Sequence, residues 1–285
     1  MTWPALLVNL LPALCLFLAP QLRADAISTR HPELLQQQIV AAYKAGQKSV
    51  VVPAGTYKIP VLTNGYHLDF EKMSNFEINA TGAVFIFQEV RAGGIYFANC
   101  DNVYFHGATL YYATPPFTQG VVRAVATDGS YLDVQVEKGY PTNLDDTRYF
   151  AAQLTGHLFD SATRWWKRNV YGDVAGMRTQ RLSTDTFRVY TSANGGAGLG
   201  DLVGFRSGTG NHMLIVQSSS RSTFQNLTIL NSPLFGIAEL GGGGLGPNRY
   251  LSITIKRGAR PSGAQTDPLF STNADAFHSV QARQG

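Results

Sequence analysis

Three side chains suited to acid–base chemistry lie close together near the end of the sequence: Asn273, Asp275 and His278. They belong to the strand-like segment Ser271-Thr-Asn-Ala-Asp-Ala-Phe-His-Ser279. A carboxylate can give or take a proton, and an imidazole three residues away can orient that carboxylate or a bound substrate. His278 fits a hydrogen-bonded structural role equally well. The segment predicts one wall of a catalytic cleft, with Asp275 as the catalytic residue and with Asn273 and His278 as substrate-binding residues.

The spacing of strand-like segments indicates which elements position these side chains. Short segments with alternating apolar residues recur along the chain, beginning at Phe76, Val103, Phe224 and Tyr250. The step from Ile78 to Phe105 is 27 residues, and the step from Phe224 to Tyr250 is 26 residues. A constant step between similar strands is typical of stacked coils that share one interior. We therefore predict an all-β solenoid with Asp275 on one of its last coils.

Two segments depart from this regular spacing of strand-like segments. Residues 32 to 46 have apolar side chains at helical spacing, so we expect a short helix that caps the first coil and leads into a strand at residues 49 to 58. Residues 118 to 206 contain the hairpin signal Thr127-Asp-Gly-Ser130 and a second glycine-rich turn. This stretch predicts an inserted antiparallel β subdomain that shapes one side of the cleft. The predicted organisation is a signal peptide at 1–26, a cap with the first coils at 27–117, the insert at 118–206, and further coils, truncated at the C-terminus, at 207–285.

The cap helix, the repeated strands and the start Val50-Val-Val-Pro-Ala-Gly-Thr-Tyr57 together resemble the pectin-lyase-like right-handed parallel β-helix proteins. Asn273-Ala-Asp275 is similar to the Asn-Thr-Asp motif of polygalacturonases. The wider segment 271–278 is closer to the Ala-Asp-Gly-x-His segment of the β-helical α-1,3-galactosidases of glycoside hydrolase family 110. This resemblance implies a right-handed parallel β-helix and an inverting glycoside hydrolase, whose other catalytic aspartates form an Asp-Asp pair about one coil later.

Inversion requires two carboxyl groups about 6.5 to 9.5 Å apart, one to protonate the leaving oxygen and one to activate water. Neighbouring parallel strands lie about 4.8 Å apart, so carboxylates one coil apart meet this requirement. The partner of Asp275 is expected near position 297, beyond Gly285. We therefore expect a chain that ends at Gly285 to bind sugar without hydrolysing it, and we expect hydrolysis from a longer product.

Further candidate residues flank the late strands. Glu239, in Phe235-Gly-Ile-Ala-Glu-Leu240, is either a substrate-binding or acid–base carboxylate or a charge at a corner of the coil. Arg257 is a second substrate-binding candidate, for sugar hydroxyls or acidic sugars, although exposed arginines usually do neither. Trp165 and Trp166 either stack on sugar rings or pack in the core of the insert, and the sequence slightly favours core packing.

The composition limits the class of protein. Residues 1 to 26 combine an apolar run with Ala24-Asp-Ala26, as in a cleaved export signal, although no Lys or Arg precedes the run. Cys100 is then the single cysteine after this signal, so internal disulfides are excluded and a large core is required. The formal charge of +4 lacks a basic tract and gives no indication of nucleic acid. Scattered acidic and His residues predict no metal and no cofactor.

The export signal and the resemblance to β-helical glycoside hydrolases together imply a secreted or periplasmic O-glycosidase. Its expected partner is a polysaccharide or oligosaccharide with galactose-type or galacturonic acid linkages, with no membrane association after signal removal. Two alternatives remain open. One is a non-catalytic carbohydrate-binding or surface β-helix protein, and the other is a polysaccharide lyase, against which the Asn-x-Asp motif argues.

Overall fold

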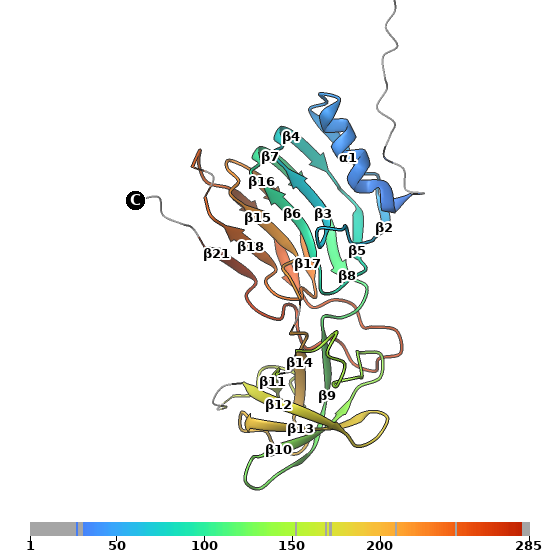
Figure 1. Ribbon diagram of the computed structural model, residues 1–285, viewed down its shortest axis with the longest axis vertical. Helices are drawn as coiled ribbons and strands as arrows, with labels where there is room; N and C mark the ends of the chain where they lie inside the picture. The colour runs from blue at the N-terminus through green and yellow to red at the C-terminus, as the bar shows by residue number, and fades with distance from the viewer. Residues whose placement is uncertain are drawn as a thin grey trace, which may run out of the picture.

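The computed structural model describes residues 27, 31–151, 153–168, 170, 173–208, 210–242 and 244–280. The expected signal peptide at residues 1–26 lies outside the described residues. Two parts are visible in Figure 1: parallel sheets with a short helix above, and an antiparallel barrel below, connected through β9 and β14.

Fifteen strands form three separate five-stranded parallel sheets. Sheet A contains β1 (Ser49–Val51), β4 (Ser74–Asn79), β7 (Asp101–His106), β16 (Thr223–Gln225) and β19 (Arg249–Leu251). Sheet B contains β2 (Gly55–Ile59), β5 (Ala83–Phe87), β8 (Thr109–Tyr112), β17 (Thr228–Leu230) and β20 (Thr254–Lys256). Sheet C contains β3 (Tyr66–Glu71), β6 (Gly93–Ala98), β15 (Leu214–Gln217), β18 (Ile237–Leu240) and β21 (Phe277–Val280).

Side chains along these strands point alternately inward and outward, and the inward-facing ones form one core that the three sheets share. Buried residues from every sheet meet there, among them Phe105 of sheet A, Leu110 of sheet B and Phe97 of sheet C. Their partners in register are also apolar; for example, Phe105 pairs with Ile78 and with Phe224. Because alternate residues of a strand point to opposite faces, the other side chains of each strand face outward and are available for a site.

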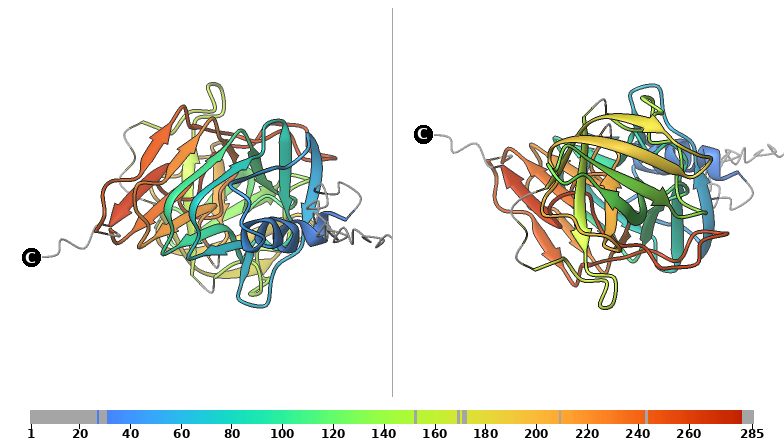
Figure 2. Two further views of the ribbon diagram at one scale, coloured as in Figure 1. Left: turned by 90° about the horizontal axis from the view of Figure 1, so that it is seen from above. Right: turned by 90° about the horizontal axis from the view of Figure 1, so that it is seen from below.

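The N-terminal helical segment is short. It consists of a 3-10 turn, η1 (Pro32–Leu34), and a ten-residue helix, α1 (Leu35–Lys44). The buried face of α1 carries Leu35, Ile39 and Ala42, which pack on the shared core beside the edge strands β1, β2 and β3. Figure 2 shows α1 at the N-terminal end of the sheets and the last strands at the opposite end.

The remaining strands form a closed antiparallel barrel in the order β10-β13-β12-β11-β14-β9. They are β9 (Phe117–Val125), β10 (Tyr131–Val136), β11 (Leu154–Phe159), β12 (Val174–Arg181), β13 (Thr186–Ala193) and β14 (Leu202–Arg206). The barrel has its own core, which includes Leu132, Phe187 and Phe205. Closure leaves no unpaired strand edge in this part.

The expectation of a single right-handed parallel β-helix is therefore wrong. The described strands form three separate parallel sheets and a closed six-stranded barrel, with only 3 and 10 residues in the N-terminal helical elements. The regular step along the sequence indicates that similar strands recur, but it does not show where backbone pairing stops. Residues with positive φ, such as Asn99, Asn226 and Asn231, turn the chain between strands, and pairing runs within each sheet.

Candidate functional site

The connection between β20 and β21, residues 257–276, lies against the barrel and delivers the predicted catalytic segment. Leu269 and Phe270 of this connection pack with aromatic residues of the barrel part. Glu137, which follows β10, accepts hydrogen bonds from the backbone N–H groups of residues 265 and 266 at 2.9 and 2.6 Å. These contacts fix the approach to β21.

Asn273 lies in the interior, with 3% of its surface exposed. Its Nδ2 donates hydrogen bonds to the carbonyl oxygens of Pro116, just before β9, at 2.6 Å and of Pro233, before β18, at 3.0 Å. Its backbone N–H also donates to the Ser232 carbonyl at 3.1 Å. The Asn273 side chain thus connects the barrel, sheet C and the β20–β21 connection, and this geometry gives it a structural role.

Asp275 and His278 are in contact at the surface. His278 Nδ1 lies 2.8 Å from Asp275 Oδ2, and the two side chains are 38% and 58% exposed. When Nδ1 carries a proton and donates it to this carboxylate, Nε2 of a neutral His278 is an acceptor toward solvent. In the part of the chain that the structure describes, Asp275 Oδ1 makes no hydrogen bond and is available to a ligand or water.

His278 also belongs to a stack of three rings, His212, Phe235 and His278, which we call the aromatic stack. The Phe235 ring lies 4.3 Å from the His278 ring and 4.6 Å from the His212 ring, with interplanar angles of 13° and 9°. His212 and Phe235 each precede their strand, β15 or β18, by the same two residues by which Asp275 precedes β21. The site is therefore built at the starts of three adjacent strands of sheet C.

The protonation of His212 follows from its position in the stack. Burial lowers the pKa of His212, and the nearby His278 lowers it further. The backbone N–H of Phe235 lies 3.3 Å from His212 Nδ1, so Nδ1 acts as the acceptor and a neutral ring carries its proton on Nε2. The stack therefore holds His278 through ring packing.

A cavity of about 240 Å³ lies beside Leu234, the neighbour of Phe235. Barrel residues, including Arg206 and Ser207, form its other wall. Arg206 Nη1 donates to the backbone carbonyl of Asn273 at 3.3 Å. The Ser207 hydroxyl is buried and has no hydrogen-bond partner among the described residues. This cavity thus offers a cation, Arg206, close to the catalytic segment, while the Ser207 hydroxyl is enclosed.

Glu239 is not brought to Asp275. It is 7% exposed on β18 and accepts a hydrogen bond from Asn248 Nδ2 at 2.8 Å. Glu239 pairs with Ser279 of β21, whereas Asp275 precedes that strand by two residues, and among the described residues the two carboxylates make no contact.

Arg257 faces the barrel. Its Nη2 donates to the backbone carbonyl of Arg164 at 3.2 Å, and its guanidinium lies 5.8 Å from the Trp165 ring centroid. Burial, followed by the charge of Arg164, lowers the pKa of Arg257. Trp165 and Trp166 are 73% and 64% exposed, so the expected core packing of this pair is wrong and their rings are open to ligands.

Sequence reasoning did not identify Arg206, His212, Phe235 or Ser207 as site residues. For His212 and Phe235 a signal existed, because both stand two residues before a strand, as Asp275 does. Arg206 ends the last barrel strand, β14, and Ser207 follows it; both reach the site only because the barrel closes beside sheet C. No local pattern marks them.

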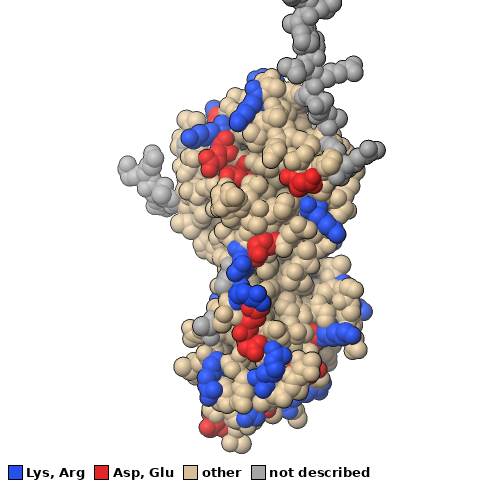
Figure 3. Space-filling model, turned by 45° about the vertical axis from the view of Figure 1, so that its right-hand side comes forward, with Lys and Arg blue, Asp and Glu red and all other residues tan. Residues whose placement is uncertain are grey.

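The surface has no dominant sign of charge on the face shown in Figure 3, where acidic and basic side chains are intermixed around the junction of sheets and barrel. Among the described residues, no group of three or more His, Cys, Asp or Glu is arranged to hold a metal ion. Within the same residues, no helix has the length and hydropathy needed to cross a membrane.

A scan against models of known protein families finds no match to this chain. A search of curated proteins likewise finds no similar sequence.

Proposed function

We propose that this protein is an exported glycoside hydrolase that cleaves galactose-type or galacturonic acid linkages of polysaccharides with inversion, with Asp275 as one of its two catalytic carboxylates. The observation that carries this proposal is the exposed Asp275 side chain, which has one oxygen bonded to His278 at 2.8 Å and the other oxygen unpaired within the described residues.

In this mechanism Asp275 is the general base. His278 fixes Oδ2, so Oδ1 has a defined direction and can accept a proton from an attacking water. The aromatic stack restrains His278 and therefore the carboxylate. The general acid would be a second carboxyl group about 6.5 to 9.5 Å away, which the sequence predicts near position 297; Glu239 is buried and bonded to Asn248 instead.

The neighbouring cavity suits part of a sugar. The guanidinium of Arg206 can pair with the carboxylate of a galacturonic acid. We therefore assign substrate contact to Arg206, and we assign positioning of the catalytic segment to Asn273.

A second candidate function is carbohydrate binding without hydrolysis. It is favoured by one observation: the Asp275 carboxylate lacks Glu239 as a partner, because Glu239 is buried and bonded to Asn248. The same surface would then bind sugar through Arg206 and the exposed Asp275 and His278.

Release of reducing sugar from galactan and from polygalacturonate tests the proposal. We expect Asp275→Asn to abolish release, while Asp128→Asn, in the exposed turn between β9 and β10, retains it. We expect Arg206→Gln to reduce activity on polygalacturonate more than on galactan. Undiminished hydrolysis by Asp275→Asn overturns the mechanism, and sugar binding by a wild-type protein that hydrolyses neither polymer selects the second function.

A further inference from the structure

A cavity of about 780 Å³ lies where sheet B meets the barrel part, and Asp275 is not among its lining residues. Its floor is the outward face of sheet B. The floor residues occupy paired positions on neighbouring strands: Val84 with Thr109, and Tyr111 with Leu230. This volume is within the range of about 300 to 1,000 Å³ that is typical of ligand sites.

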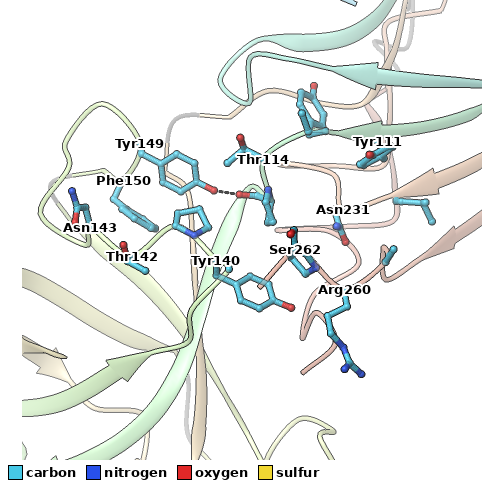
Figure 4. A pocket seen from close by; sticks show the side chains of 18 of the residues that line it. Tyr111, Thr114, Tyr140, Thr142, Asn143, Tyr149, Phe150, Asn231, Arg260 and Ser262 are labelled. Atoms are coloured by element: carbon cyan, nitrogen blue, oxygen red, sulfur yellow. Dashed lines mark hydrogen bonds between the residues drawn. The ribbon is translucent and has the colours of Figure 1, made fainter. Parts of the chain in front are cut away.

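Two chain segments form the walls: residues 139–150, between β10 and β11, and residues 259–262 of the β20–β21 connection. The Tyr149 hydroxyl donates to the Pro115 carbonyl, a contact drawn as a dashed line in Figure 4. Tyr140 donates to the Thr266 carbonyl at 3.0 Å. Both walls are therefore anchored, and the cavity is formed before any ligand binds.

The lining is rich in unpaired hydroxyl groups and aromatic rings. Within the described part of the chain, the hydroxyls of Tyr111, Thr114, Thr142 and Ser262 make no hydrogen bond, and Figure 4 shows these residues around the cavity with Tyr140, Tyr149 and Phe150. Aromatic faces pack on the apolar face of a sugar ring, and free hydroxyls can both donate and accept. An entirely apolar ligand would leave these hydroxyls unpaired as it buried them.

Charge distinguishes neutral from acidic sugars here. The lining contains two charged residues, and each already has a partner of opposite sign: Asp146 pairs with Arg148 at 3.0 Å and Arg260 with Asp267 at 2.9 Å. A carboxylate on the ligand would meet no uncompensated cation and would approach Asp146. The lining therefore favours an uncharged, hydroxyl-rich ligand.

We infer that this cavity is a separate binding site for a short neutral oligosaccharide, which would hold a polysaccharide chain at a distance from Asp275. The carbohydrate class rests on the proposed function, but the site and its residues are independent of Asp275. The site differs from the cavity beside Arg206, a cation without an ion-pair partner among the described residues, which suits acidic sugars.

Isothermal titration with galactotriose and trigalacturonate tests this inference. The titrations use Asp275→Asn protein, so that hydrolysis does not consume the ligand. We expect galactotriose to bind more tightly than trigalacturonate at the cavity, with Tyr111→Ala weakening galactotriose about tenfold through the lost ring contact. Ser262→Ala, a milder change at an exposed position, should weaken it about threefold through one lost hydrogen bond.

The matched control is Tyr104→Ala, which removes a half-buried, outward-facing tyrosine from β7 of sheet A and should leave binding unchanged. No binding of galactotriose, or equal affinity in Tyr111→Ala, Ser262→Ala and the control, overturns the inference. If galactotriose binding depends on Tyr111 but the wild-type protein hydrolyses neither polymer, this site is supported and the proposed hydrolase function is rejected. If hydrolysis depends on Asp275 but galactotriose binding does not depend on Tyr111, only the proposed second binding site is rejected.

Discussion

Substitution of Asn273 by Asp tests how the catalytic segment is positioned. The change preserves the shape of the side chain but replaces the Nδ2 donor with an oxygen. That oxygen would face the carbonyls of Pro116 and Pro233, at the places where Nδ2 now donates at 2.6 and 3.0 Å. The site is 3% exposed, so water cannot replace the lost donors without a structural change.

The magnitude depends on the protonation state of the introduced carboxyl. Burial against two carbonyls raises the pKa of the introduced Asp carboxyl above its value in the unfolded chain. The variant is therefore least destabilised at pH values below the pKa of this carboxyl in the unfolded chain, and it loses stability as pH rises through the pKa in the folded protein. At pH 4 the neutral acid still donates once, and the loss is about 1 kcal/mol for the other hydrogen bond. At pH 7 an uncompensated buried charge costs about 3–5 kcal/mol.

Thermal unfolding at several pH values measures this effect. A loss of 1 kcal/mol lowers Tm by about 2–4 °C in a domain of this size class, so the difference between pH 4 and pH 7 is readily resolved. The control is Asn226→Asp, at an exposed position where the effect should stay within about 0.5 kcal/mol. Unchanged Tm at both pH values, together with weaker sugar binding, would refute the structural role and return Asn273 to the substrate-binding residues.

Three further predictions concern other parts of the molecule. His67 is fully buried, and burial lowers its pKa to about 4, so the stability that its neutral form contributes is complete above about pH 6.5 and is lost as pH falls toward 4. In urea unfolding, the stability of His67→Gln should therefore depend less on acid pH than that of the wild type, and an unaltered dependence would contradict this. Burial raises the pKa of Cys100 to about 11, so a thiol reagent at pH 8 should label this cysteine only after unfolding. Peptide mapping would detect the label, and rapid labelling of the native protein would be inconsistent with the burial of Cys100. Gly139 has φ +92°, and a Cβ added there would lie only 2.5 Å from the Ala264 backbone nitrogen, so Gly139→Ala should destabilise the protein by about 1–2 kcal/mol or more in thermal unfolding. Gly242→Ala, with open space around it, should not; equal Tm values for the two variants would show that the β20–β21 connection moves to accommodate the methyl group.

Local patterns in the sequence identified many strands but not the architecture. Alternation places Phe76, Phe105 and Phe224 on buried faces, and all three are buried in β4, β7 and β16. Strand partners are non-local, since Phe105 pairs with Phe224 across more than a hundred residues that include the barrel. The division into three sheets and the closure of the barrel depend on such pairings, which periodicity does not encode.

The site shows the same limit. The 2.8 Å contact of Asp275 with His278 spans three residues, and their spacing in the sequence suggested it. The burial of Asn273 depends on Pro116, 157 residues away, and on Pro233, 40 residues away. Arg206 enters the site through the barrel. Residue type and spacing therefore predicted a reactive pair, while its supporting residues followed from tertiary contacts.

The measurement that tests the central proposal most directly is proton NMR of the first sugar released from galactan or polygalacturonate by the wild type and by Asp275→Asn. We predict that a wild-type product that includes the second carboxyl group expected near position 297 releases a sugar whose anomeric configuration is opposite to that of the cleaved bond, because water attacks from the face held by Asp275. We predict no product from Asp275→Asn, although the variant remains folded. Release of a product with retained configuration, or unchanged release by Asp275→Asn, would contradict the assignment of Asp275 as the base of an inverting glycoside hydrolase.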